Sequence, residues 1–132
     1  MTSHLANLGL LLLRAGVGFS VFYYHGLGKI MNPEKWERIG ADMTLIGIDF
    51  WPKFWGLLAS LAESAGAALI VLGLFTRPAA FVLAFTMLMA VIHHISLEER
   101  FSHPMELGFV FLALLLTGAG KYSLDGWWRG GH

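Results

Sequence analysis

The sequence predicts an all-α membrane protein: a membrane-spanning four-helix bundle with a short interfacial helix in the first loop. The chain has 132 residues, of which 56% are hydrophobic and only 14% are charged, whereas about a quarter of the residues in an average soluble domain are charged. A soluble domain of this size buries only about two thirds of the surface that its unfolded chain exposes, so this much apolar surface indicates a lipid environment. The second observation is a series of apolar runs whose lengths are close to the ~20 residues that a membrane-spanning helix needs.

The first predicted span covers about residues 5–27, and only Arg14 interrupts its run LGLLLLRAGVGFSVFYY. In the loop that follows, four apolar side chains recur at spacings of three and four residues: Trp36, Ile39, Met43 and Ile46. This periodicity favours a short amphipathic helix lying at the membrane interface over an ordinary solvated loop.

The remaining spans are predicted at about 54–75, 79–97 and 104–119, which places residues 1–132 in one transmembrane domain. Glu63 alone breaks the second span. Pro78 stands at the start of the third span, where a proline is compatible with the first helical turn. In the second span Ala62 and Gly66 have the small-xxx-small spacing that lets helix backbones approach closely.

Composition excludes several classes of function. The chain has no cysteine, which excludes thiolate catalysis and cysteine-ligated iron–sulfur clusters within it. The formal net charge is +0, so neither nucleic acid nor a polybasic lipid-binding tail is indicated. The partner that the apolar composition does predict is the lipid bilayer.

Four spans place both termini on one side of the membrane, here named side A, and the first loop and SLEERFSH on the other, side B. Arg14 and Glu63 each lie about midway through their spans, so we expect them to meet at similar depth. An ionisable residue within a membrane is a functional hypothesis by default, because a charge at a helix centre costs about 2.5–3.5 kcal/mol on insertion scales.

Further polar residues lie nearer side B and are expected to complete a polar funnel above the Arg14–Glu63 pair. The pocket candidates are Arg14, His25, Lys29, Glu63, His94 and Glu106. Plainer interpretations stay open: the pair fixes helix register only, the histidines meet interfacial water, and Glu106 favours a helix dipole. His25, His93, His94 and His103 are alternatively candidate metal ligands.

The chain resembles the DoxX/DoxD-like family of small membrane proteins over nearly its whole length. The matching segments are LLLRAGVGFSVFYYHGLGK, AESAGAALIVLGLFTRPAA and MELGFVFLALLLTGAGKYSLD. Their most specific parts are Arg14, His25-Gly26-x-x-Lys29, Glu63 with Gly66, Gly73-x-x-Thr76-Arg77 and Gly118-x-Gly120-x-x-Ser123-x-Asp125. The resemblance implies a four-helix protein of the bacterial-type inner membrane, with Gly66, Gly73 and Arg77 as structural motif residues.

Members of this family are associated with membrane redox chemistry, and one branch resembles subunits of thiosulfate:quinone oxidoreductase. The first functional hypothesis is therefore a quinone-linked membrane subunit that acts with a membrane or soluble oxidoreductase partner. His titrates near neutral pH and would move protons in such a site. The alternatives are a non-enzymatic assembly or anchoring subunit of a membrane complex, and a bundle that binds haem or copper. A homo-oligomer is compatible with each of these hypotheses.

Overall fold

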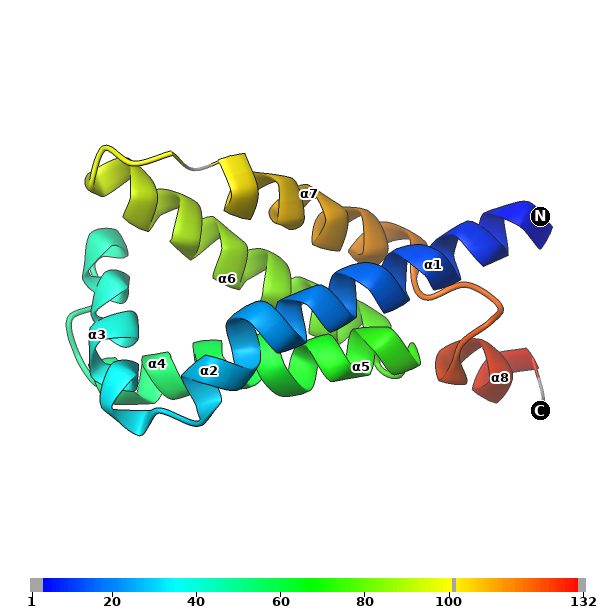
Figure 1. Cartoon of the computed structure of the whole chain (residues 1–132), viewed down its shortest axis with the longest axis horizontal. Helices are drawn as coiled ribbons and strands as arrows, with labels where there is room; N and C mark the ends of the chain where they lie inside the picture. Colours follow the sequence, from blue (N-terminus) through cyan, green and yellow to red (C-terminus); the bar gives the residue numbers. More distant parts are fainter. Residues whose placement is uncertain (1–3, 101, 131–132) are drawn as a thin grey trace.

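The computed structural model describes residues 4–100 and 102–130, and all regular structure within these ranges is helical (Figure 1). The prediction of an all-α fold is thus confirmed for the described residues. The elements are α1 (His4–Val21), the π-helix η1 (Phe22–Gly26), α2 (Leu27–Ile30), the 3₁₀-helix η2 (Pro33–Lys35), α3 (Trp36–Gly40), the 3₁₀-helix η3 (Ala41–Ile46), α4 (Pro52–Leu61), the π-helix η4 (Ala62–Gly66), α5 (Ala67–Leu72), α6 (Thr76–Ser96), α7 (Ser102–Thr117) and α8 (Leu124–Gly130).

Three continuous helices are long and apolar enough to cross a membrane: His4–Ile30, Pro52–Leu72 and Thr76–Ser96. The fourth apolar helix, Pro104–Thr117, is shorter. Its residues rise about 21 Å, against a bilayer core of about 30 Å. A membrane-spanning role for three helices follows from length and composition, and the count of four spans stays a prediction.

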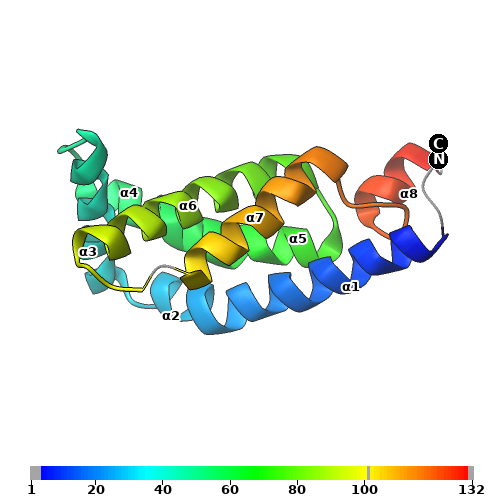
Figure 2. The ribbon, with the colours of Figure 1, turned by 90° about the horizontal axis from the view of Figure 1, so that it is seen from above.

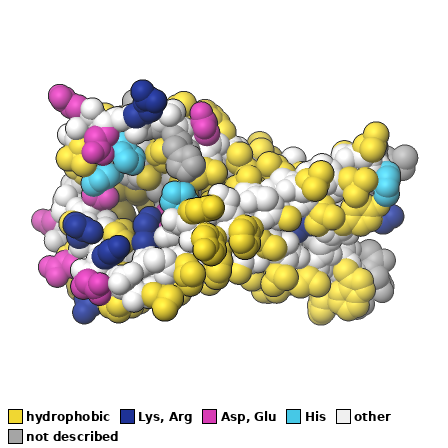
Figure 3. Space-filling view, in the orientation of Figure 1, with side chains coloured by type: hydrophobic (Ala, Val, Ile, Leu, Met, Phe, Trp, Pro, Cys, Tyr) yellow, Lys and Arg dark blue, Asp and Glu magenta, His cyan; other side chains and the backbone are white. Residues whose placement is uncertain are grey.

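The long helices pack side by side, with α1 on α5, and α6 on η4, α5 and α7. Their shared core contains Val21, Ile70, Leu83, Phe111 and Leu114, all with 0% exposure. Apolar side chains also cover much of the outside, as Figure 3 shows for one face. Large apolar side chains that are exposed include Leu5, Leu12, Phe19, Phe81, Leu88, Phe109 and Leu116. Extensive exposed apolar surface is expected where lipid is the solvent.

The two ends of the molecule differ. The N- and C-terminal segments lie together at one end, side A, and α3 and the α6–α7 connection lie at the other, side B (Figures 1 and 2). The predicted helix of the first loop is present as η2, α3 and η3. It packs on α4 so closely that a Cβ on Gly40 would lie 1.5 Å from the carbonyl oxygen of Pro52.

The sequence analysis missed α8. No helix was predicted after the fourth span, because the tail is short. A signal was nevertheless present, because Ser123 is a good helix N-cap. Its Oγ accepts a hydrogen bond from the backbone N–H of Gly126 at 2.9 Å, three residues along the chain.

Candidate functional site

Glu63 lies in the middle of the helix Pro52–Leu72, and its side chain is only 5% exposed. Lys29 of α2 is its partner: Nζ donates a hydrogen bond to Oε2 of Glu63 over 2.5 Å. A carboxylate among apolar helices is costly unless it is paired. The ion pair with Lys29 therefore accounts for the presence of Glu63 at this depth.

Two π-helices bring this pair together. η1 and η4 pack against each other, and a Cβ on Gly26 would lie 2.1 Å from the carbonyl oxygen of Glu63. Glycine is required at such a close approach of two backbones. Lys29 follows Gly26 by about one helical turn, which places its side chain beside Glu63. π-Helical turns are rare in proteins, and those that do occur are often found at functional sites.

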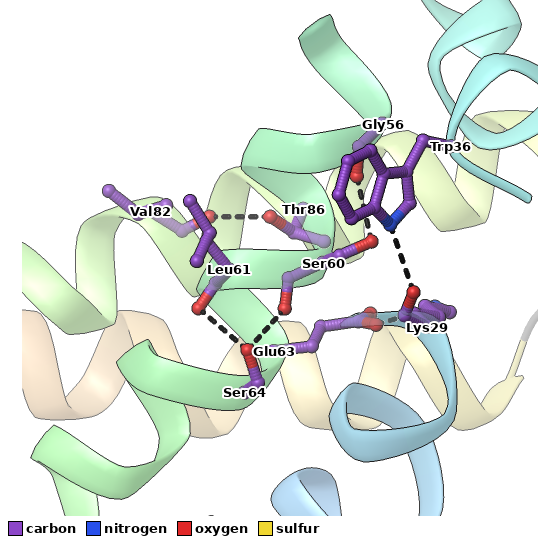
Figure 4. A network of polar contacts seen from close by, with 9 residues as sticks. All are labelled: Lys29, Trp36, Gly56, Ser60, Leu61, Glu63, Ser64, Val82 and Thr86. Atoms are coloured by element: carbon purple, nitrogen blue, oxygen red, sulfur yellow. Dashed lines mark hydrogen bonds and ion pairs between the residues drawn. The ribbon is translucent and has the colours of Figure 1, made fainter. Parts of the chain in front are cut away.

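Hydrogen bonds fix the backbone around the ion pair, as Figure 4 shows. The indole Nε1 of Trp36 donates to the carbonyl oxygen of Lys29 at 2.9 Å, which ties α3 to α2. Ser60 Oγ donates to the carbonyl oxygen of Gly56 at 2.8 Å within α4. Glu63 points from η4 toward Lys29. The charged pair is thus held by four elements: α2, α3, α4 and η4.

A cavity of about 670 Å³ extends from this pair toward side B. Its size falls within the ~300–1,000 Å³ of small-molecule sites. Figure 3 shows the hollow, ringed by basic, acidic and histidine side chains. The apolar lining includes Met43, Trp55, Leu58, Val82, Phe85 and Met89, and the charged or titratable lining is Lys29, Arg38, Asp42, Glu63, His93 and His94.

The two adjacent histidines of α6 both line this cavity, and each contacts a different carboxylate. His93 Nδ1 lies 2.7 Å from Oδ1 of Asp42, and His94 Nδ1 lies 2.9 Å from Oε1 of Glu99. An ionised carboxylate only accepts hydrogen bonds, so each Nδ1 carries the hydrogen. In the neutral imidazole this leaves Nε2 as a hydrogen-bond acceptor.

The cavity contains some of the residues proposed from the sequence. Lys29, Glu63 and His94 line it, as does His93, which was proposed only as a metal ligand. His25 is half-buried in η1 and Glu106 is exposed in α7; neither is part of the lining. Arg38 and Asp42 were missed. The predicted loop helix could have indicated both residues, because Arg38 and Asp42 are four positions apart and such residues lie on the same face of a helix.

The expected pair of Arg14 and Glu63 is wrong. Arg14 Nη1 donates to the carbonyl oxygens of Ile70 and Val71 at 3.3 Å, and Nη2 donates to the carbonyl oxygen of Tyr122. The reason is helix register. Opposite Glu63 stands Gly26 of the first helix, so Arg14 lies about three helical turns away, toward side A.

Arg14 belongs to a structural cluster at side A. Ile70 and Val71 are near the end of α5, where carbonyls lack partners from a following helical turn. The carbonyl oxygen of Ile70 accepts from the N–H of Gly73 at 3.1 Å, and Arg14 adds a donor to it and to that of Val71. Gly73 ends this helix at φ +70°, and a Cβ there would lie 2.3 Å from Arg14 Nη1. Arg14 is completely buried.

The chain after α7 completes this cluster. The Asp125 carboxylate accepts hydrogen bonds from the backbone N–H groups of Phe75 and Thr76 at 2.9 Å, and so caps the start of α6. Its own N–H donates to the carbonyl oxygen of Gly73 at 2.8 Å. Arg77 Nη2 donates to the carbonyl oxygen of Leu116 at 3.4 Å. Gly73 and Arg77 thus both lie at side A, beside the chain that follows α7.

Gly66 has a looser environment than its spacing suggested. A Cβ there would make ordinary contacts at 3.8 Å with Leu83. The close approaches of this helix to the first helix are made by Gly18 and Gly26 instead.

The proposed metal ligands do not form one cluster in the described part of the chain. Within residues 4–100 and 102–130 no three His, Cys, Asp or Glu side chains are grouped as a metal site requires. The side chain of His103 lies outside the described residues.

Apolar helices of membrane length around a partly polar cavity define a small integral membrane protein. Residues 9–95 match the family model DoxX, and the chain belongs to the DoxX family. A relative in Escherichia coli (strain K12), called inner membrane protein YqjF, is 32% identical over 111 residues, covering 80% of this chain and 81% of that protein. The chain is thus an integral protein of the bacterial-type inner membrane.

A second relative, an uncharacterized protein of Haemophilus influenzae, is 35% identical over 78 residues. This match covers 52% of this chain and 58% of that protein, so it spans less than two thirds of the relative. No solved structure matches the chain significantly.

Proposed function

We propose that this chain is a redox-associated membrane subunit whose cavity binds a quinone headgroup. The observation that carries the proposal is the Lys29–Glu63 ion pair inside a cavity with a largely apolar lining. A quinone ring is flat and apolar, and its carbonyl oxygens accept hydrogen bonds. The Lys29 ammonium has three N–H groups, and one of them donates to Glu63. Another is available for a quinone carbonyl.

The remaining polar groups suit the protons of this chemistry. Reduction of a quinone to a hydroquinone takes up two electrons and two protons. His93 and His94 line the same cavity as Lys29 and Glu63, and an imidazole ring can both accept and donate a proton. The chain has no cysteine with which to hold an iron–sulfur cluster, so in this proposal a partner oxidoreductase supplies the electrons.

The test is a titration of the purified protein in lipid nanodiscs with decylubiquinone, followed by tryptophan fluorescence. Trp55 lines the cavity, so a bound quinone is expected to quench it in a saturable way, and Trp55→Phe is expected to lose that component. Lys29→Met should weaken binding roughly tenfold to a hundredfold, the value of one hydrogen bond to a charged group.

Lys35→Met is the matched control, because Lys35 is exposed in η2 and lies outside the cavity lining. The double variant Lys29→Met/Glu63→Gln buries no lone charge and should bind as weakly as Lys29→Met. Quenching that never saturates, or that both single lysine variants leave unchanged, would overturn the proposal and favour an anchoring role.

A further inference from the structure

One wall of the cavity is formed where α4 and α6 separate. The two helices share a neighbour in η4, on which α6 packs. Toward side B α4 packs on α3 and α6 packs on α7, and η3 contacts both α4 and α6. The space left between them is part of the cavity, which α4 lines with Trp55 and Leu58 and α6 lines with Val82 and Phe85.

Three side chains of this wall face both inward and outward. Leu58, Val82 and Phe85 line the cavity, yet they are 40%, 46% and 42% exposed. Met43 and Met89 also line the cavity but are closed off, at 7% and 8% exposed, whereas Leu97, just after α6 at side B, is 54% exposed. A residue that lines a cavity and is also open to the outside marks an opening. Because these helices have the length and composition of membrane spans, the opening between α4 and α6 faces lipid chains.

The opposite end of the cavity has a different character. Arg38, Asp42 and His93 lie there, and the hydrogen bond of 2.7 Å between Asp42 and His93 joins η3 to α6. The cavity is therefore open at a largely charged end at side B, near Leu97, and has a second, apolar opening within the membrane-spanning part. An amphiphile matches this division, with its polar head inside and its apolar chain in the apolar opening.

We propose that the ligand is a membrane-dissolved amphiphile that enters between α4 and α6 and leaves its apolar chain against Leu58, Val82 and Phe85. That the polar head of this amphiphile is a quinone rests on the proposed function. Burial of apolar surface is favourable in proportion to the area covered, and a chain in the opening covers side chains that a chainless ligand leaves exposed. The site would therefore select its ligand by the chain as well as by the head.

The test compares decylubiquinone with the same benzoquinone lacking the chain, by isothermal titration calorimetry in nanodiscs. Concentrations are expressed per lipid, because a chain also raises the amount of ligand dissolved in the bilayer. The unchanged protein is expected to bind the chain-bearing quinone at least about tenfold more tightly. Leu58→Trp and Val82→Trp fill the opening and should abolish this preference while the chainless quinone still binds.

Leu61→Trp and Leu88→Trp are matched controls on the same two helices. Both positions are exposed, at 40% and 52%, and neither lines the cavity. Equal affinities for the two quinones, or an equal effect of the opening and control variants, would overturn the lateral entry and leave the quinone site standing. Failure of both quinones to bind the unchanged protein would overturn the site and the entry together.

Discussion

Arg14 is completely buried and donates to three backbone carbonyl groups, from α5 and from Tyr122. Its planar guanidinium is suited to several acceptors at once, whereas lysine offers a compact ammonium on a flexible stem. This arrangement joins the first helix, α5 and the segment before α8. The charge of Arg14 therefore has a structural use, away from the cavity.

Arg14→Lys is accordingly predicted to lower stability by about 2–4 kcal/mol, because it loses hydrogen bonds from a charged donor to buried acceptors. Thermal unfolding in detergent measures this as a lower Tm. The affinity of the folded variant for decylubiquinone should equal that of the unchanged protein. A normal Tm together with weaker quinone binding would contradict the structural assignment of Arg14.

Single residues were predictable from the sequence where they interrupted an apolar run. Glu63 was identified in this way, and Lys29 and His94 as polar residues nearer side B. Their partners were harder to predict, because the partner depends on the register of two antiparallel helices. Midpoints of apolar runs gave Arg14 as the partner of Glu63, whereas the close approach of Gly26 to η4 brings Lys29 there.

The contact between η1 and η4 is the element-scale feature on which the site depends. Gly26→Ala places a methyl group 2.1 Å from the carbonyl oxygen of Glu63, so the two π-helices must separate. We predict a lower Tm and loss of quinone binding, because Lys29 moves away from Glu63. Both are measured on protein purified in the same detergent and then placed in nanodiscs.

Gly28→Ala is the control for this prediction. It lies in the same helical segment, and a Cβ there meets nothing within 4 Å. Alanine is favoured over glycine in a helix by roughly 0.5–1 kcal/mol, so this variant should be at least as stable as the unchanged protein and should bind quinone normally. Equal behaviour of the two variants would show that the η1–η4 contact does not position the site.

Elements were predictable where hydropathy was periodic or continuous, and less so where tertiary contacts shape the backbone. The helix of the first loop was predicted from the spacing of Trp36, Ile39 and Met43, and it is present. The π-helical turns carry no comparable sequence signal. Each inserts a wider turn into a helix that is otherwise regular, and here both occur where the two helices touch.

At the scale of the whole molecule, polar residues divide between two ends. Arg14, Gly73 and Asp125 hold the side A end together, and Lys29, Glu63 and His93 surround the cavity near side B. The sequence predicted that polar groups gather toward side B, but it merged the two sets into one funnel. Residues that share a family motif thus have separate roles, one structural and one proposed for ligand binding.

The molecule also has a second, shallower hollow, a groove of about 490 Å³ between α1 and α7 lined by Gly9, Gly16 and Leu107. It is lined mostly by apolar and small residues, and none of its lining residues in the described part of the chain is charged. This groove is the natural competitor for an apolar ligand, so an assay that locates the ligand is more informative than one that only detects binding.

The most direct measurement of the central claim is photolabelling with an azidoquinone in nanodiscs, followed by mass spectrometry of the labelled peptides. The predicted result is labelling of α2, α4 and α6 around Lys29, Trp55 and Phe85, suppressed by excess decylubiquinone. Labelling confined to α1 and α7, along the groove at Gly9 and Gly16, or labelling that decylubiquinone does not suppress, would contradict a quinone site in the cavity.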